Sequence, residues 1–335
     1  MKRIFILLLV FSGFCLFSVT AFAGNGDIDK FNDEFSFEEM ISGIDSDTLE
    51  ILSSMGITDL SYESVFGVTP AKVFDSFLDI FWGSFKEPLK YFFSVTGVMA
   101  IMALLTNLSR SPETVTLIGS SCVACLLAVP VVSLITRSFS VLESISVFTS
   151  SFAGVFCAVV SASGGVIQGT SFLGLNIALN SVMSVILSEF SKPLSNCMCA
   201  LSFLSCFNIK TFSERMSDLF KKFYIFILGL LTTVFSGLSA IKTILGGSAD
   251  TVAVKGVKFL VGRSLPIVGG IVSESYQSVL ASLGLIKNTV GVFGILTVVI
   301  IVFPILTELF IWCLSFNFIS TTSEIFGCFK IENLI

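Results

Sequence analysis

Few polar side chains interrupt the apolar stretches of this sequence, and two of them are spaced to act together. Asn176 and Asn180 are four residues apart, so they would share one face of a helix and point into a helix bundle. They either form part of a polar pathway or make interhelical hydrogen bonds that fix packing, which we favour. Glu308 is the one acid inside a strongly apolar run. It either relays protons or couples ions, or it reaches the headgroups from near the end of its helix, which we favour.

The remaining candidate groups do not indicate catalysis. The sequence has no His, which excludes Ser-His-Asp, Cys-His and His-bearing zinc sites. Cys122 and Cys125 have CxxC spacing, but their flanks are apolar, so we interpret them as small hydrophobic residues in a helix. Gly164, Gly165 and Gly169 lack the Lys-Ser/Thr of a phosphate loop and indicate a tight reversal or small-residue packing. We therefore predict no enzyme, no cofactor and no metal.

The composition indicates that membrane helices position these groups. Hydrophobic residues make up 54% of the chain and charged residues 13%, with a mean hydropathy of +0.95. Ordinary soluble domains carry about 25% charged residues. No basic stripe is present to meet phosphates, which argues against a nucleic-acid partner. The predicted fold class is an all-α, polytopic membrane protein.

The N-terminal region reads as a secretory leader followed by an acidic segment. A basic Lys2-Arg3 start, an apolar core and Ala21-Phe22-Ala23 predict a signal peptide over residues 1–23, although the same stretch could stay attached as a first helix. Residues 24–88 then form an acidic extracytoplasmic segment of short amphipathic helices. Between Asp27 and Lys90 the sequence has 14 Asp+Glu against 4 Lys+Arg.

Hydropathy predicts about seven membrane helices after this segment. Six lie within residues 89–245 and the last within 289–314, followed by a polar tail over 315–335. The predicted spans are Lys90–Leu108, Val115–Thr136, Ile145–Ala162, Ser171–Phe190, Pro193–Asn208, Phe223–Ile241 and Val290–Leu314. A cytoplasmic position for Lys210–Lys222 satisfies the positive-inside rule. The side of the C-terminus stays open.

Residues 246–288 do not fit a simple span. Arg263, Pro266, Gly269 and Gly270 interrupt an apolar run, and a second short run follows over Ser278–Ile286. Either each run is a half-helix of a re-entrant element, or the pair crosses the membrane once. Pro and Gly at membrane depth are typical of backbone that lines a cavity or packs tightly. We take Arg263–Gly270 as the best candidate functional element.

The sequence from Lys255 to Ser275, with its continuation from Leu283 to Gly291, resembles the stage III sporulation protein AE family of endospore-forming bacteria. The pattern that carries the resemblance is Pro266-x-x-Gly269-Gly270 with Lys287-Asn288 downstream. Family members also have a leader, a polar external segment and a polytopic body. They continue into further apolar helices after the last predicted span, whereas this sequence continues into a more polar tail.

The resemblance implies a non-enzymatic subunit of a channel-like complex between mother cell and forespore, which supports late forespore gene expression after engulfment. The implied partners are a secretion-type ATPase and ring-forming membrane proteins from the same operon, and a forespore membrane protein. The implied location is the mother-cell membrane around the forespore. The alternative is an independent secondary transporter, with Asn176, Asn180 and Glu308 as its site residues. An intramembrane protease is a weaker third possibility, because the spans show no paired carboxylates.

Overall fold

We describe the chain from a computed structural model, in which every regular element of the described residues is a helix. The described residues are 40–57, 64–65, 67–205, 216, 218–234, 236–237, 252, 254–256, 259 and 269–326. The predicted signal peptide, most of the element 246–268 and the end of the predicted tail lie outside them. The all-α class is confirmed for the described residues.

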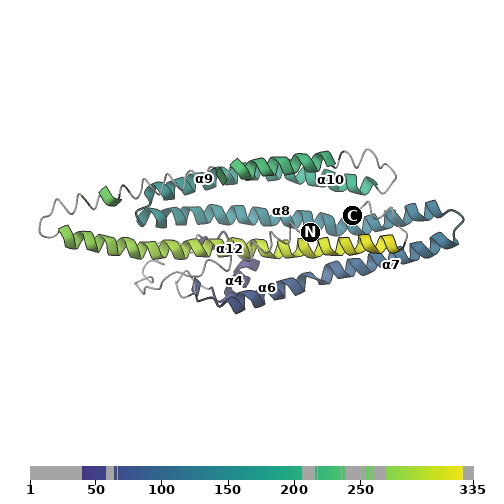
Figure 1. Ribbon diagram of the computed structural model, residues 1–335, viewed down its shortest axis with the longest axis horizontal. Coiled ribbons are helices and arrows are strands. Elements are labelled where there is room, and N and C mark those ends of the chain that lie inside the picture. Colours follow the sequence, from purple (N-terminus) through teal and green to yellow (C-terminus); the bar gives the residue numbers. More distant parts are fainter. Residues whose placement is uncertain are drawn as a thin grey trace.

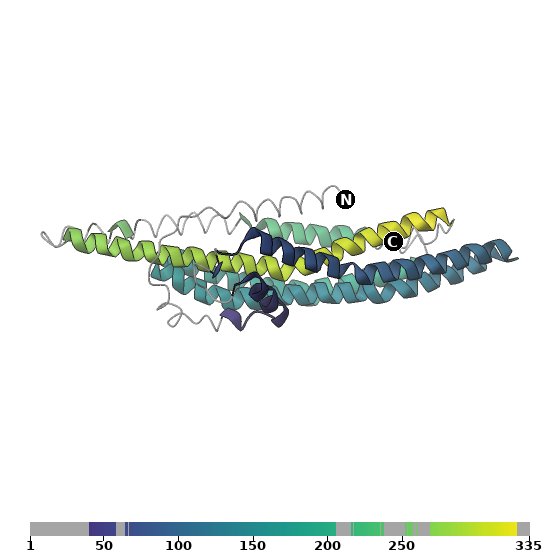
Figure 2. The same cartoon turned by 90° about the horizontal axis from the view of Figure 1, so that it is seen from below.

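The body of the protein is an elongated bundle of long antiparallel helices (Figure 1). They are α7 (Lys86–Leu108), α8 (Pro112–Ala162), α9 (Val166–Val185), a π-helical segment (Ile186–Ser191), α10 (Lys192–Ser205) and α12 (Gly269–Ile325). With 51 and 57 residues, α8 and α12 are about 76 and 86 Å long. Figure 2 shows the same lengthwise arrangement from below.

Two shorter helices precede this body. Helix α4 (Ser46–Met55) begins where the Asp45 carboxylate accepts the Thr48 N–H at 3.2 Å, and it ends at Gly56, whose φ of 92° favours glycine. Helix α6 (Pro70–Ser84) has Pro in its first turn and continues into α7 through Phe85, whose backbone is itself helical. The predicted amphipathic helices are therefore present, and the second of them runs directly into the first long helix.

The predicted break between the second and third spans is wrong. Residues 115–136 and 145–162 belong to one continuous helix, α8. The intervening residues, from Arg137 to Ser144, include two charged residues and three serines but neither Gly nor Pro. Polar side chains alone do not stop a helix, because its backbone hydrogen bonds are internal.

The predicted break near Pro193 is also absent. The chain passes from α9 to α10 through the π-helical segment Ile186–Ser191, where the Lys192 N–H bonds the Leu187 carbonyl. A proline lacks an N–H and its ring crowds the carbonyl four residues before it. The wider π-helical turn accommodates both effects without ending the helix. Residues 218–234, which include the first part of the sixth predicted span Phe223–Ile241, are helical as well.

The predicted boundaries near residues 288 and 315 are wrong too. Residues 269–288, 289–314 and 315–325 all belong to α12. Gly269 and Gly270 are the first residues of this helix rather than part of a turn. Lys287 and Asn288, at the end of the predicted element 246–288, are both compatible with a helix interior. The re-entrant element is therefore not confirmed, and Arg263 and Pro266 lie outside the described residues.

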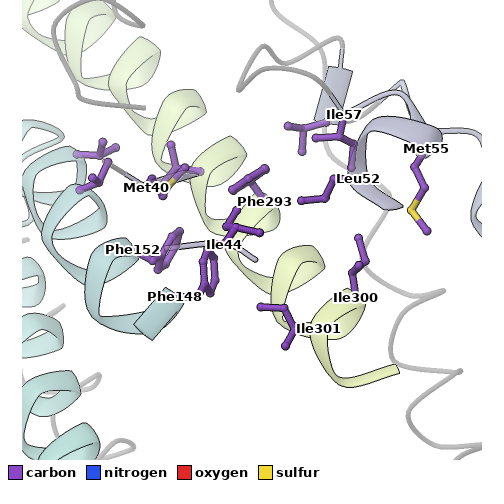
Figure 3. Packing of buried hydrophobic residues seen from close by; sticks show 14 residues of the cluster. Met40, Ile44, Leu52, Met55, Ile57, Phe148, Phe152, Phe293, Ile300 and Ile301 are labelled. Carbon is purple, nitrogen blue, oxygen red and sulfur yellow. The ribbon is translucent and has the colours of Figure 1, made fainter. Parts of the chain in front are cut away.

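Two hydrophobic clusters form the core, one toward each end of the bundle. The larger joins the N-terminal segment to α8 and α12, and Figure 3 shows Met40, Ile44 and Leu52 facing Phe148, Phe152 and Phe293. The smaller joins α7, α8 and α12 and contains Val95, Met99, Met102, Val123, Leu127 and Ile319. The acidic N-terminal segment therefore shares its core with the long helices and does not form a separate domain.

Within the described residues, four helical stretches are long and apolar enough to cross a membrane, judged by length and composition. They are Ala71–Leu108, Pro112–Ala162, Val166–Phe203 and Ser278–Ile325. The predicted count of seven is not confirmed, chiefly because pairs of predicted spans merge into single helices.

Candidate functional site

The strongest polar contact between the long helices is an ion pair that involves Glu308. Arg137 of α8 donates from Nη1 to the Glu308 Oε1 of α12 at 2.9 Å. Its Nη2 lies 4.0 Å from the Oε2 of Glu87 on α7. The Glu308 side chain is 18% exposed and the Arg137 side chain 52%. One guanidinium thus connects three helices.

A fourth helix adds a cation at the same level. The Lys192 Nζ of α10 lies 5.9 Å from the ring centre of Phe139, two residues after Arg137 on α8. We call Glu87, Arg137, Lys192 and Glu308 the charged layer. It lies between the two hydrophobic clusters, since the larger cluster includes residues up to Ile301 of α12 and the smaller includes Ile319.

Glu308 is among the candidates that the sequence predicts, but its partner Arg137 is not. Arg137 lies between the predicted spans that end at Thr136 and begin again at Ile145. A signal was present, because each residue interrupts a long apolar run and their charges are opposite. Neither the headgroup role nor the proton-relay role of Glu308 anticipated this ion pair.

Asn176 and Asn180 lie together, as their spacing predicts. The Asn180 Nδ2 donates to the Asn176 Oδ1 at 2.9 Å and to the Ser150 Oγ of α8 at 2.7 Å. It also lies 3.3 Å from the Ser146 carbonyl. The amide thus joins α9 to α8, which fits the packing role that we favoured for these residues.

The glycines between α8 and α9 serve a close reversal and close packing, as predicted. Gly164 has a φ of 88° in the turn. A Cβ on Gly169 would lie 2.8 Å from the Cys157 carbonyl oxygen and 2.8 Å from the Ser161 Oγ. Because one of these atoms belongs to the backbone of α8, only a glycine permits this approach of the two helices.

The residues that carry the family resemblance are only partly described. Lys287 is half-buried and its Nζ donates to the Gln168 Oε1 of α9 at 3.0 Å, while Asn288 beside it is exposed. This contact joins α12 to the start of α9, far from the charged layer. Lys287 and Glu308 therefore do not form one site, although both connect α12 to neighbouring helices.

The contacts described above hold helices against one another. Among the described residues, no three Cys, Asp or Glu side chains gather where they could hold a metal ion. Six cysteines, including Cys122 and Cys125, are free thiols. The contacts of Arg137 with Glu308, Asn180 with Ser150 and Lys287 with Gln168 each join two helices. Polar contacts of this kind fix the relative positions of long apolar helices.

Comparison with known proteins identifies one family. The sequence pattern described as "Stage III sporulation protein AE" matches residues 57–331. A curated protein described as "Stage III sporulation protein AE", from Bacillus subtilis (strain 168), is 22% identical over 164 residues, which are 49% of this chain and 41% of that protein. The chain thus spans about two fifths of the length of this curated relative. No solved structure matches.

Proposed function

Because the chain belongs to the stage III sporulation protein AE family, we propose that it is a non-enzymatic membrane subunit of the assembly that links mother cell and forespore. In this role it supports late forespore gene expression after engulfment. The family match over residues 57–331 is the observation that carries the proposal. The four apolar helices that are long enough to cross a membrane support a multi-pass location.

The proposed location is the mother-cell membrane that surrounds the forespore. The proposed partners are the cytoplasmic secretion-type ATPase and the ring-forming membrane proteins of the same operon, together with a forespore membrane protein. The family resemblance supports these partners. The acidic segment before α7 would face the space between the two cell membranes, where it could contact those subunits.

We propose that the protein acts as a scaffold or as part of a conduit wall rather than as an independent carrier. A transporter would need Glu308 free to bind and release a proton or an ion. Its 2.9 Å contact with Arg137 instead favours a fixed position between helices. The hydrogen bonds of Asn180 to Asn176 and to α8 favour packing in the same way.

We further propose that Arg263–Gly270 is the functional element of the membrane body, because Arg, Pro and two adjacent Gly in an apolar run need a structural reason. The double substitution Gly269→Leu with Gly270→Leu should block sporulation after engulfment while membrane insertion stays normal. The control is Gly97→Leu with Gly174→Leu, since nothing lies within 4 Å of a Cβ at either position. Normal spore yield from the first double variant would refute this role.

A further inference from the structure

We propose that a lipid bilayer surrounds only one half of the bundle, and that the charged layer marks the surface of this bilayer on the side away from the cytoplasm. The uncharged half comprises α7 from Tyr91, α8 from Thr114 to Thr136, α10 after Lys192, and α12 from Leu309 to Ser323. The acidic half comprises α4, α6, α9 and the rest of α8 and α12. It would stand outside the membrane, on the side away from the cytoplasm. This inference rests on the membrane location in the proposed function but not on the role in sporulation.

The helix lengths require that part of the bundle leave the bilayer. The hydrocarbon core is about 30 Å thick, whereas α8 with its 51 residues is about 76 Å long. Fitting all of α8 into one core needs a tilt of about 67°, beyond the range of about 0–40° seen for membrane helices. About half of α8, and more of α12, must therefore lie outside a single hydrocarbon core.

The uncharged half has the dimensions of a bilayer. Tyr91–Leu108, Thr114–Thr136 and Leu309–Ser323 contain 18, 23 and 15 consecutive residues without a charged side chain. These stretches are about 27, 35 and 23 Å long, which brackets the hydrocarbon thickness. Lys90, Arg137 and Glu308 end them on one side, and Arg110, Glu113 and Glu324 end them on the other. Charges at both edges of an apolar slab are typical of a membrane-spanning region.

Aromatic residues mark the same edge. Both tryptophans of the chain lie beside the charged layer, Trp82 five residues before Glu87 and Trp312 four residues after Glu308. Trp82 is 66% exposed, whereas Trp312 is 2% exposed and packs inside the bundle with its ring centre 5.5 Å from that of Tyr91. Of the two, only Trp82 is therefore placed to meet a membrane surface. Trp and Tyr concentrate at membrane surfaces, where an apolar ring and a polar N–H or O–H are both accommodated.

The acidic half also contains uncharged helix stretches with exposed apolar side chains, among them Val166 and Ile295. It differs from the uncharged half in the exposed carboxylates of its α4 and α6 regions. The exposed side chains of Asp45, Asp47 and Glu50 belong to the α4 region, which packs on α12 through a cluster that includes Phe293. Phe293 is 15 residues before Glu308, which places this contact about 22 Å beyond the charged layer. Asp75 and Asp79 of α6 are exposed along the same half. Ionised carboxylates at that depth in lipid would be strongly unfavourable, so this half must contact water.

The orientation of the bundle across the membrane follows from the charges of its loops. The turn from α7 to α8 carries Arg110, and the sequence after α10 carries Lys210 and Arg215. The positive-inside rule places these residues in the cytoplasm. Helix α12 runs parallel to α7, so it ends on the same side. Four described helices thus cross at the uncharged half, and the chain must cross back once between α10 and α12.

Matched positions on single helices test where the bilayer lies. On α8, Val129 is 65% exposed in the uncharged half and Val147 is 52% exposed in the acidic half. On α12, Phe318 and Ile295 form the equivalent pair, at 62% and 64%. Each would be replaced by Cys in a full chain whose native cysteines are changed to Ala, spin-labelled, and placed as one copy per lipid nanodisc. Collision with oxygen, which concentrates in lipid, would be compared with collision with a water-soluble nickel complex.

We expect oxygen to dominate at V129C and F318C and nickel to dominate at V147C and I295C. Three results would each overturn the inference. They are stronger collision with oxygen at V147C and I295C, stronger collision with nickel at V129C and F318C, and shielding of V147C and I295C from nickel. The orientation is tested in intact cells with a membrane-impermeant maleimide, which should label S163C but label R110C only after permeabilisation. The reverse labelling would refute the direction. Neither experiment depends on spore formation, so its failure is separable from failure of the proposed function.

Discussion

Arg137 and Glu308 are unequally buried. We therefore predict that replacing each of them lowers the free energy of unfolding by a different amount. Replacing Arg137 with Met leaves the Glu308 carboxylate, 18% exposed, without its cation. Replacing Glu308 with Gln leaves Arg137, 52% exposed, free to reach water and the Glu87 carboxylate 4.0 Å away. Removing one partner costs about 3–5 kcal/mol in a fully buried pair and about 0–1 kcal/mol in an exposed one. For this half-buried pair we expect about 1–2 kcal/mol for R137M and less than about 1 kcal/mol for E308Q.

The measurement is a double-mutant cycle on the purified chain in mild detergent. Helical circular dichroism would follow unfolding by SDS for the parent, R137M, E308Q and the double variant. A loss of about 1–2 kcal/mol changes the folding equilibrium constant by a factor of about 5–30, which such titrations resolve. The double variant should be less destabilised than the sum of the single variants, since neither neutral group then leaves a charge unpaired.

The control is Arg110→Met, which removes the same charge from an exposed turn residue. We expect a change within about 0.5 kcal/mol for it. Equal costs for R137M and R110M, or strictly additive effects of R137M and E308Q, would refute the claim that this ion pair holds α8 against α12.

Three further outcomes follow from packing. Gly294→Ala should cost about 1–3 kcal/mol, because its Cβ would clash with the buried Phe152 ring. Gly97→Ala, with nothing within 4 Å of its Cβ, should be neutral or stabilising in the same unfolding assay. Gly169→Ala should separate α8 from α9, because its Cβ would meet a backbone carbonyl at 2.8 Å; an unchanged unfolding midpoint would contradict this. Asn180→Leu should cost about 0.6 kcal/mol, the usual value for an interhelical hydrogen bond in membranes, and a stabilised variant would argue against the packing role.

The sequence was sufficient for features that depend on local pattern. The four-residue spacing of Asn176 and Asn180 placed both on one helix face, and Gly164 to Gly169 indicated a close reversal with tight packing. The alternation of apolar and acidic residues predicted the helix that contains Phe77. In each case the information lies within one or two helical turns, where backbone geometry alone relates the residues.

Helix ends were harder to predict, because hydropathy indicates the surroundings of a segment and not the residue at which its helix ends. Arg137 to Ser144 reads as a loop by polarity, yet it lacks the Gly or Pro that ends a helix. The same error separated Lys287 from the span that follows it. Two predicted spans thereby became one helix about twice as long as a bilayer is thick.

Contacts between distant segments could not be predicted at all. The pairing of Arg137 with Glu308 joins residues 171 positions apart. The docking of Met40 and Leu52 against α8 and α12 depends on the fold of the whole chain, since a single sequence gives no measure of which apolar faces meet. In both contacts the partners lie far apart in the sequence.

The central claim, a role in the assembly that links mother cell and forespore, is tested most directly by forespore gene expression. The gene would be deleted in its own host, and a reporter for late forespore transcription would be followed after engulfment is complete. The account predicts normal engulfment, loss of the reporter signal, and recovery when the full-length gene is supplied from a mother-cell promoter. A normal late reporter signal in the deletion strain, or recovery only from a forespore promoter, would contradict it.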